Sequence, residues 1–170
     1  MMGETGILLR PWEMEDKLSL VKYANNKKIA DNLRNLFPYP FEEKNADHFI
    51  SLWTSMQPVR VFAIELDGEA IGAIGLHAKE DVHEKNMELG YWLAEPFWGK
   101  GIATRAVGMM VNYGFKTWPI LRIYAGAFGS NIASQKVLEK CGFFREGILK
   151  NSIWKNERID DEIIYAIYRD

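Results

Sequence analysis

The sequence predicts one α/β (α+β) domain in which helices flank a single mixed sheet. A length of 170 residues suits one domain. The apolar residues follow helical spacing in the first third of the chain and then change to the pattern of strands that alternate with helices. Neither an internal repeat nor a low-complexity tract or linker divides the sequence. We therefore expect residues 1–170 to fold as one domain.

The first third of the chain predicts a short strand and three helical segments. Pro11 ends a strand at residues 7–10. Each proline of the segment 37–41 restricts the residue before it, so this aromatic segment must be a loop. Apolar residues at helical spacing predict helices over residues 14–24, 29–33 and 46–53.

The rest of the chain predicts strands that alternate with two helices. Strands at residues 61–66 and 69–77 are joined by Asp67-Gly68, which is typical of a two-residue hairpin turn. The remaining elements are, in order, a strand at 87–93, a helix at 101–116, a strand at 121–126, a helix at 132–140 and a closing pair of strands at 143–153 and 159–168.

Composition excludes several classes of protein. The net charge of -2 lacks the basic excess that a nucleic-acid-binding protein normally carries. Cys141 is the only cysteine, which excludes an intramolecular disulfide. No uncharged apolar run reaches the length of about 18 residues that a membrane span needs, and residues 1–6 have no signal-peptide character. We expect a cytoplasmic protein with neither a nucleic-acid nor a membrane partner.

Aromatic residues make up 13% of the chain, which suggests that some of them line a cleft. The three histidines, His48, His77 and His83, lack the spacing of metal ligands, so we expect no metal site. His77 ends a strand that could border a cleft, but we expect it to be a structural or exposed histidine.

The segment from Trp98 to Thr104 carries the chemical signal of the sequence. It lies between a predicted strand and a predicted helix, and Gly99 and Gly101 allow the backbone to turn sharply and approach a ligand. The unpaired N–H groups of the first helical turn favour an anion such as a phosphate, with Lys100 at the rim and Arg105 beside it. The spacing fits neither a Walker A loop nor the dinucleotide fingerprint. A plain connection rich in glycine is the alternative.

Three motifs together resemble a known family. Glu88-Leu89-Gly90-Tyr91-Trp92-Leu93, the segment Trp98-Gly99-Lys100-Gly101-Ile102-Ala103-Thr104, and Asn131-Ile132-Ala133-Ser134 with Glu139-Lys140-Cys141-Gly142-Phe143 after it resemble the GNAT N-acetyltransferases of the RimJ/RimL (ribosomal-protein-alanine acetyltransferase) type. The likeness covers nearly the whole chain. It implies the GNAT fold, which is a mixed, mostly antiparallel sheet of six to seven strands that splays at the cofactor site.

The resemblance also implies that acetyl-CoA is the co-substrate. Backbone N–H groups from Gly99 to Thr104 would hold its pyrophosphate, and Trp98 stands where the family usually has Gln or Arg. The pantetheine arm would pair with the strand before the loop. The implied cofactor-binding residues are Trp92, Leu93, Trp98, Gly99, Lys100, Gly101, Ile102, Ala103, Thr104, Asn131 and Ser134.

Acetyl transfer to an amine needs a general base, and Glu88 is the first candidate. By strand alternation it shares a face with Gly90 and Trp92, so we expect partial desolvation to raise the pKa of its carboxyl group. Family members that use a Glu on this strand support the choice. A solvated Glu, or one that only holds a substrate ammonium group, is the alternative. Asp161 and Glu162 are reserve candidates.

The departing thiolate needs a proton donor, and Leu138 replaces the tyrosine that is common in the family at this position. Ser134 resembles the serine with this role in the RimL type, and Asn131 would bond pantetheine or orient Ser134. Alternatively, both residues only cap the helix and a water supplies the proton.

The resemblance implies an N-acetyltransferase that moves the acetyl group directly to a primary amine, either a protein N-terminus or a small molecule. A backbone N–H near Leu93 would stabilise the oxyanion. Phe37, Tyr39 and Trp92 are expected to bind the acceptor, although Phe37 and Tyr39 could equally cover the core. The missing tyrosine keeps an alternative open, which is a catalytically weak sensor or scaffold that binds acetyl-CoA. A homodimer is compatible with the family.

Overall fold

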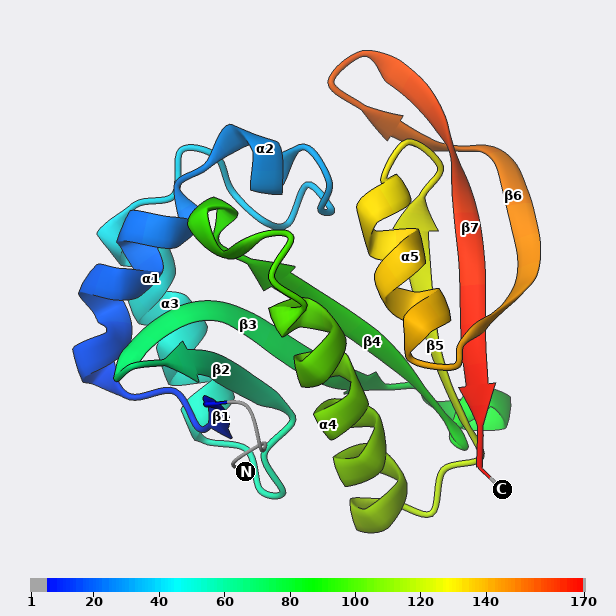
Figure 1. The fold of residues 1–170 in the computed structure, drawn as a ribbon, viewed down its shortest axis with the longest axis horizontal. Coiled ribbons are helices and arrows are strands. Elements are labelled where there is room, and N and C mark those ends of the chain that lie inside the picture. Colours follow the sequence, from blue (N-terminus) through cyan, green and yellow to red (C-terminus); the bar gives the residue numbers. More distant parts are fainter. Residues whose placement is uncertain (1–5, 170) are drawn as a thin grey trace.

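A seven-stranded sheet forms the centre of the molecule (Figure 1). The computed structural model describes residues 6–169, and the strand order is β1-β2-β3-β4-β5-β7-β6. Neighbouring strands are antiparallel except β4 and β5, which run parallel. The mostly antiparallel mixed sheet confirms the predicted fold class. The strands are β1 (Ile7–Arg10), β2 (Val61–Leu66), β3 (Glu69–Ala78), β4 (Asn86–Leu93), β5 (Arg122–Phe128), β6 (Phe144–Lys155) and β7 (Arg158–Tyr168).

Helices cover both faces of the sheet, as Figure 1 shows. On one face lie α4 (Ile102–Thr117) and α5 (Ile132–Lys140), and on the other lie α1 (Lys17–Ala24) and α3 (Glu43–Thr54). The short helix α2 (Lys27–Ala30) follows α1. Among residues 6–169, three 3-10 helices complete the elements, namely η1 (Met14–Asp16), η2 (Asp81–His83) and η3 (Glu95–Phe97).

The turn between β2 and β3 shows how local sequence starts the sheet. Asp67 and Gly68 have φ values of 52° and 83°. Two consecutive positive φ values give the turn whose twist matches that of paired strands, which explains the preference for Asp-Gly. The turn pairs Leu66 with Glu69 and begins the strand that ends beyond His77.

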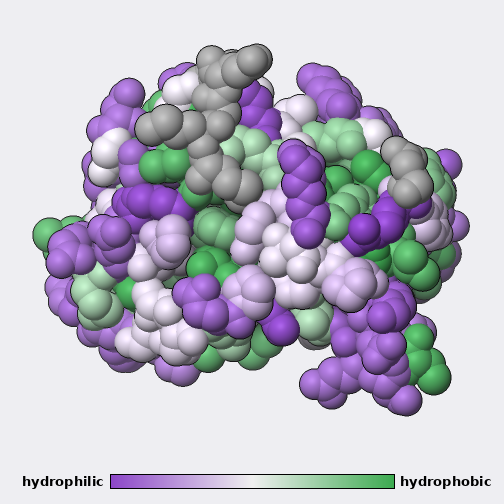
Figure 2. Space-filling view, turned by 90° about the horizontal axis from the view of Figure 1, so that it is seen from below, coloured by the Kyte–Doolittle hydropathy of each residue, from purple (hydrophilic) through white to green (hydrophobic). Residues whose placement is uncertain are grey.

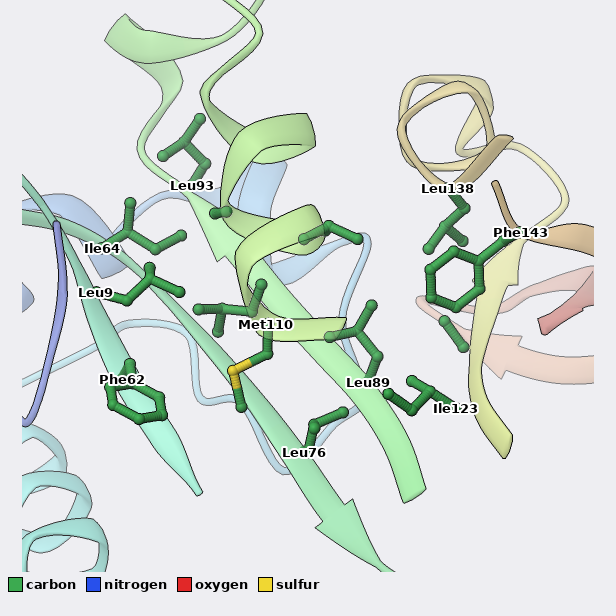
Figure 3. Close-up of a cluster of buried hydrophobic side chains, with 14 of the residues drawn as sticks. Leu9, Phe62, Ile64, Leu76, Leu89, Leu93, Met110, Ile123, Leu138 and Phe143 are labelled. Atoms are coloured by element: carbon green, nitrogen blue, oxygen red, sulfur yellow. The ribbon is translucent and has the colours of Figure 1, made fainter. Parts of the chain in front are cut away.

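Two hydrophobic clusters, one on each face, hold the layers together. The larger cluster lies beneath α4 and α5, where Met110 and Leu138 pack on the sheet (Figure 3). Strand β4 contributes to both clusters, because Leu89 and Leu93 belong to the larger one and Trp92 belongs to the smaller one with residues of α1 and α3. The alternation of faces that the sequence predicts for this strand is therefore confirmed.

Most predicted elements coincide with observed ones to within a few residues at each end. Two segments differ. The predicted helix at 14–24 divides into η1 and α1, and the segment predicted as helical at 29–33 is instead α2, which starts earlier. The Asn26 side chain accepts a hydrogen bond from the backbone N–H of Lys28, so it caps this helix and sets its first turn at residue 27.

The surface carries a mixture of hydrophilic and hydrophobic residues. Figure 2, which views the molecule from below, shows many hydrophilic residues with hydrophobic residues in small groups between them. Within residues 6–169, no helix is long and apolar enough to cross a membrane, and no cluster of three or more His, Cys, Asp or Glu residues could hold a metal ion. Residues 1–5, for which we expected no signal-peptide character, lie outside the described part of the chain.

Met110 tests the role of the larger cluster. Its side chain is completely buried, so Met110→Ala leaves a cavity and should lower the free energy of unfolding by about 2–5 kcal/mol. Met14→Ala is the matched control, because Met14 is 52% exposed and the change should stay within about 0.5 kcal/mol. Urea unfolding followed by circular dichroism measures both values. Equal effects of the two substitutions would contradict the packing described.

Candidate active site

Strands β4 and β5 separate soon after their pairing begins. Their register joins only residues 86–88 to residues 122–124, whereas β3 pairs with β4 as far as Leu93. Figure 1 shows the two strands diverging beyond this short contact. We call the space between residues 89–93 of β4 and 125–128 of β5 the opening. Its presence agrees with the expectation of a splayed sheet.

The free edge of β4 presents hydrogen-bonding groups to the opening. Ala94 donates its N–H to the carbonyl of Ile71, in line with the β3 side of the pairing. Because donors alternate in direction along an antiparallel strand, the N–H groups of Tyr91 and Leu93 point the other way, toward β5. An extended ligand could therefore pair with β4 as an additional strand.

The loop after β4 forms the second part of the site. Gly99 and Gly101 both have φ values of 74°, which favour glycine, and Gly101 is the N-cap of α4. Ile102 is buried in the core and anchors the first turn, which Ala103 and Thr104 continue. The first-turn N–H groups of this helix have no helical partners and favour an anion.

Arg105 gives an independent sign that the loop binds an anion. Its Nε is buried and has no hydrogen-bond partner among residues 6–169. The guanidinium lies close to Gly101, and its Nη1 makes only a long bond of 3.4 Å to the carbonyl of Lys100. A buried donor without a partner is costly, so a phosphate oxygen at this place would satisfy it.

Trp98 braces the loop against the end of β4. Its indole Nε1 donates a hydrogen bond of 2.7 Å to the carbonyl of Leu93, and its side chain remains 44% exposed. Lys100 lies nearby, with its Nζ 5.4 Å from the centre of the Phe97 ring. The predicted cofactor residues of β4 and of the loop are thus brought together at one end of the opening.

Glu88 is the last residue of β4 that pairs with β5, and it is buried. Its Oε1 accepts a hydrogen bond from Arg34, and its Oε2 accepts one from Lys79 at 2.7 Å. The hydroxyl of Tyr124 lies 3.4 Å from Oε2. Both carboxylate oxygens therefore face donors.

These partners overturn one expectation. Burial by itself raises the pKa of the Glu88 carboxyl, but the hydrogen bond from Lys79 and the positive charges of Arg34 and Lys79 outweigh it and lower the pKa below its ordinary value. The prediction of a raised pKa is wrong, because it took account of desolvation and not of two cations from other elements.

Ser134 and Asn131 lie at the start of α5. Asn131 is the N-cap, and its side chain accepts a hydrogen bond from the Ser134 N–H at 3.1 Å. The Ser134 hydroxyl lies 2.8 Å from the hydroxyl of Tyr91, which comes from β4 on the other side of the opening. Burial raises the pKa of Tyr91 to about 12, despite its hydrogen bond to Ser134, so this hydroxyl stays protonated at neutral pH. Leu138 is fully buried in the core.

The aromatic residues predicted to bind the acceptor separate into two environments. The Phe37 ring lies 5.9 Å from that of Trp92 and 5.4 Å from that of Phe41. Tyr39 is 53% exposed and makes no ring contact within the described chain. The structure therefore brings Phe37 and Trp92 together and leaves Tyr39 apart.

The reserve carboxylates lie on β7. Asp161 accepts hydrogen bonds from Lys150 at 2.6 Å and from the backbone N–H of Asn151 at 2.9 Å. The Glu162 side chain occupies the space beside Gly126, where a Cβ would collide with it. Glu162 thus lies against β5, whereas Asp161 is hydrogen-bonded to residues of the neighbouring strand β6.

The segment after α2, residues 31–34, connects both halves of the sheet, and we call it the strap. Its Arg34 binds Glu88 on β4. The carbonyl of Leu33 accepts a hydrogen bond of 2.8 Å from Lys155 on β6, and Asp31 accepts one of 2.8 Å from Asn156 in the turn before β7. The strap therefore spans from one side of the opening to the other.

Three residues of this site were not found from the sequence. Arg34 lies 54 residues from Glu88 in the chain, and no pattern links them. The contact of Lys79 with Glu88 could have been predicted, because the pairing of β3 with β4 across a short connection brings the two residues close together. Tyr91 lies on the face opposite Glu88, as the alternation along this strand implies, and its hydroxyl reaches the opening from that face.

Comparison with known proteins agrees with this geometry. Residues 7–144 match the family described as "Acetyltransferase (GNAT) domain". The match covers most of the chain, so the chain belongs to the GNAT acetyltransferase family. The resemblance stated from the sequence motifs is therefore confirmed.

Individual relatives are 27% to 36% identical to this chain over the regions that match. YoaA of Bacillus subtilis, an uncharacterized N-acetyltransferase, is 36% identical over 59% of this chain and 56% of its own length, so the matched region spans little more than half of that relative. The spermidine N(1)-acetyltransferase of Escherichia coli K12 is 27% identical over 96% of this chain and 86% of its own length. The ribosomal-protein-serine acetyltransferase of the same organism is 31% identical over 63% of this chain and 59% of its own length.

The fold has solved counterparts. A RimL structure, described as the ribosomal L7/L12 alpha-N-protein acetyltransferase in complex with coenzyme A, superposes with a TM-score of 0.85. It covers 97% of this chain and 95% of its own, at 22% identity. At that identity the likeness establishes the fold.

The stability of the protein should depend on pH through Glu88. A carboxyl group whose pKa is lowered on folding stabilises the protein above its ordinary pKa, and this contribution is lost as the pH falls through the lowered value. Glu88→Gln should therefore lower the free energy of unfolding at pH 7 by about 1 kcal/mol, a modest value because Arg34 is 65% exposed. The difference should vanish at acidic pH. Urea unfolding between pH 3 and pH 7 measures it, with the exposed Glu84→Gln as control. A difference that grows with acidity would contradict the assigned ion pairs.

Proposed function

We propose that this protein transfers the acetyl group of acetyl-CoA directly to a primary amine. The observation that carries the proposal is the opening on β4 that ends at a glycine-rich helix N-terminus with the unpartnered donor of Arg105. Family membership supports the reaction class, and the RimL relative in complex with coenzyme A supports the co-substrate. In this proposal the residues from Gly99 to Thr104 hold the pyrophosphate through backbone N–H groups.

The pantetheine arm pairs with the free edge of β4 in this proposal. The outward N–H groups of Tyr91 and Leu93 are the available donors on that edge, and the one near Leu93 stabilises the oxyanion of the tetrahedral intermediate. Asn131 lies at the start of α5 and keeps Ser134 in place. Trp92 lines the acceptor side together with Phe37.

The bond changes of the transfer define what the side chains must do. The amine nitrogen bonds to the acetyl carbon, the carbon–sulfur bond breaks, and the sulfur takes a proton while the nitrogen loses one. We assign the proton for the sulfur to the Ser134 hydroxyl, which the protonated Tyr91 hydroxyl supports at 2.8 Å. Tyr91 thus places a tyrosine hydroxyl at this site although residue 138 is leucine. Glu88, with Asp161 and Glu162 in reserve, is the base that the sequence predicts.

A second candidate is a sensor or scaffold that binds acetyl-CoA with little turnover. The engagement of both Glu88 oxygens by Arg34 and Lys79 favours it, because an ion-paired carboxylate of low pKa is a weak base. Release of free thiol from acetyl-CoA separates the two functions. Tight binding of acetyl-CoA without thiol release for any amine would refute the proposed acetyltransferase activity.

The acceptor is tested with a panel of amines. Spermidine represents the relatives that act on small amines, and peptides with N-terminal Ser, Ala or Thr represent those that act on ribosomal proteins. Thiol release and mass spectrometry of the acetylated product identify the class. Sedimentation of the purified protein tests the homodimer, which stays a prediction, as does the cytoplasmic location.

Gly101→Glu should abolish binding of acetyl-CoA. The carboxylate adds bulk and negative charge beside the pyrophosphate site. Gly101→Gln separates charge from backbone strain, since both variants share the positive φ, and it should bind more tightly than Gly101→Glu. Gly108→Glu on the same helix is the control, because a side chain there meets open space. Calorimetric titration with acetyl-CoA measures the affinities, and unchanged affinity in Gly101→Glu would refute the loop assignment.

Ser134→Ala should lower kcat by about 100-fold while the affinity for acetyl-CoA changes little, because a general acid acts in the transition state. Tyr91→Phe should produce a smaller loss, since it removes only the partner of Ser134. Ser55→Ala, at the exposed end of α3, is the control. Steady-state kinetics with the best amine of the panel measure all three. Full activity of Ser134→Ala would contradict this assignment and indicate that a water molecule donates the proton to the sulfur.

A further inference from the structure

His77, which is exposed as one of the sequence expectations had it, lies opposite Glu88 at the start of the opening. The two residues are register partners on β3 and β4, and cross-strand partners share a face. The His77 ring packs edge-on against Trp53 of α3, with the ring centres 5.4 Å apart. This contact holds the imidazole on the acceptor side of the sheet.

Gly90 opens a path from His77 to the opening. A Cβ at position 90 would lie 3.6 Å from Nε2 of His77, so the ring lies directly beside this glycine. Gly90 is also the first residue on the Glu88 face beyond the point where β4 leaves β5. A larger side chain here would stand between the imidazole and the edge of β4.

The hydrogen bonds on this face leave one basic nitrogen unused. Glu88 is held by Arg34 and Lys79, as described above. Neither ring nitrogen of His77 has a hydrogen-bond partner among residues 6–169. The imidazole is therefore the available proton acceptor where β4 enters the opening.

The charges around His77 keep it neutral near pH 7. The His77 side chain keeps access to solvent, but the groups packed around the imidazole desolvate it and so lower its pKa. Glu88 raises the pKa, and the positive charges of Arg34, Lys79 and Arg60 lower it further. The net pKa lies below the ordinary value for histidine. The phenol of Tyr124 also faces Glu88, from β5.

We propose that His77 is the general base that accepts the proton of the acceptor amine, and that Glu88 is a positioning residue that holds Arg34 and Lys79. The inference rests on the proposed function. The substrate ammonium gives one proton to His77, and the neutral nitrogen bonds to the acetyl carbon. The carbon–sulfur bond then breaks, the sulfur takes a proton from Ser134, and the nitrogen loses its second proton, which replaces the one that Ser134 gave. The imidazolium then releases its proton to solvent, so the balance is one amide, one free thiol and one proton.

The test compares His77→Gln, Glu88→Gln and the wild type with spermidine and with a peptide that begins with serine. His77→Gln should lower kcat at pH 7 by about 100-fold or more with little change in acetyl-CoA affinity. His83→Gln, on the exposed helix η2, is the matched control and should keep full activity. Imidazole added to His77→Ala should restore part of the lost rate.

The pH profile distinguishes the two candidate bases. With His77 as base, activity falls as the pH drops through a value somewhat below about 6.5, whereas Glu88 would place this fall below about 4.3. Histidine NMR titration of the wild type gives the His77 pKa without relying on any variant. A His77 pKa above 7, or a His77→Gln enzyme with wild-type rate and acid limb, would overturn the proposal while leaving the acetyltransferase intact. A wild type that transfers acetyl to no amine would overturn the proposed function and this inference with it.

Discussion

The short parallel contact between β4 and β5 is the constraint on which the rest of the site depends. Three residue pairs join the strands β1–β4 to the strands β5–β7, and beyond them the two halves of the sheet are free to diverge. Each half has its own helices and contributes its own groups. The edge of β4 brings donors and Gly90, and the helix after β5 brings Ser134. A longer pairing would have produced a closed sheet without room for a ligand strand.

Local neutralisation of charge explains how this protein, whose own net charge is -2, can bind an anionic ligand. Backbone donors of the loop supply the positive potential that many proteins obtain from clusters of Lys and Arg. On the acceptor side, Glu88 compensates the charge of Arg34 and Lys79 rather than adding a free negative charge. In the proposed mechanism, this leaves the proton chemistry to groups that are neutral at pH 7, namely the imidazole of His77 and the hydroxyls of Ser134 and Tyr91.

The sequence was informative wherever a property depends on near neighbours in the chain. Hydrophobic periodicity located the strands and the two long helices α3 and α4, and Asp67-Gly68 located a turn, because these follow from residues a few positions apart. The loop at Gly99 and Gly101 was found for the same reason. The pKa direction of Glu88 was missed because it depends on contacts across the fold, with Lys79 on the neighbouring strand β3 and with Arg34, which lies 54 residues away in the chain. Periodicity states which face a side chain takes, as it did for Tyr91, but not how far its hydroxyl extends.

The strap has a consequence for how the protein folds. Lys155 and Leu33 are 122 residues apart in the chain, and Asn156 and Asp31 are 125 apart. Contacts of such separation close very long loops, so they form after the local hairpins and helices have already assembled. We expect the two hydrophobic clusters to be in place before the strap joins the halves of the sheet. The contacts of the strap would then be the last part of the native structure to form and the first to break when the protein begins to unfold.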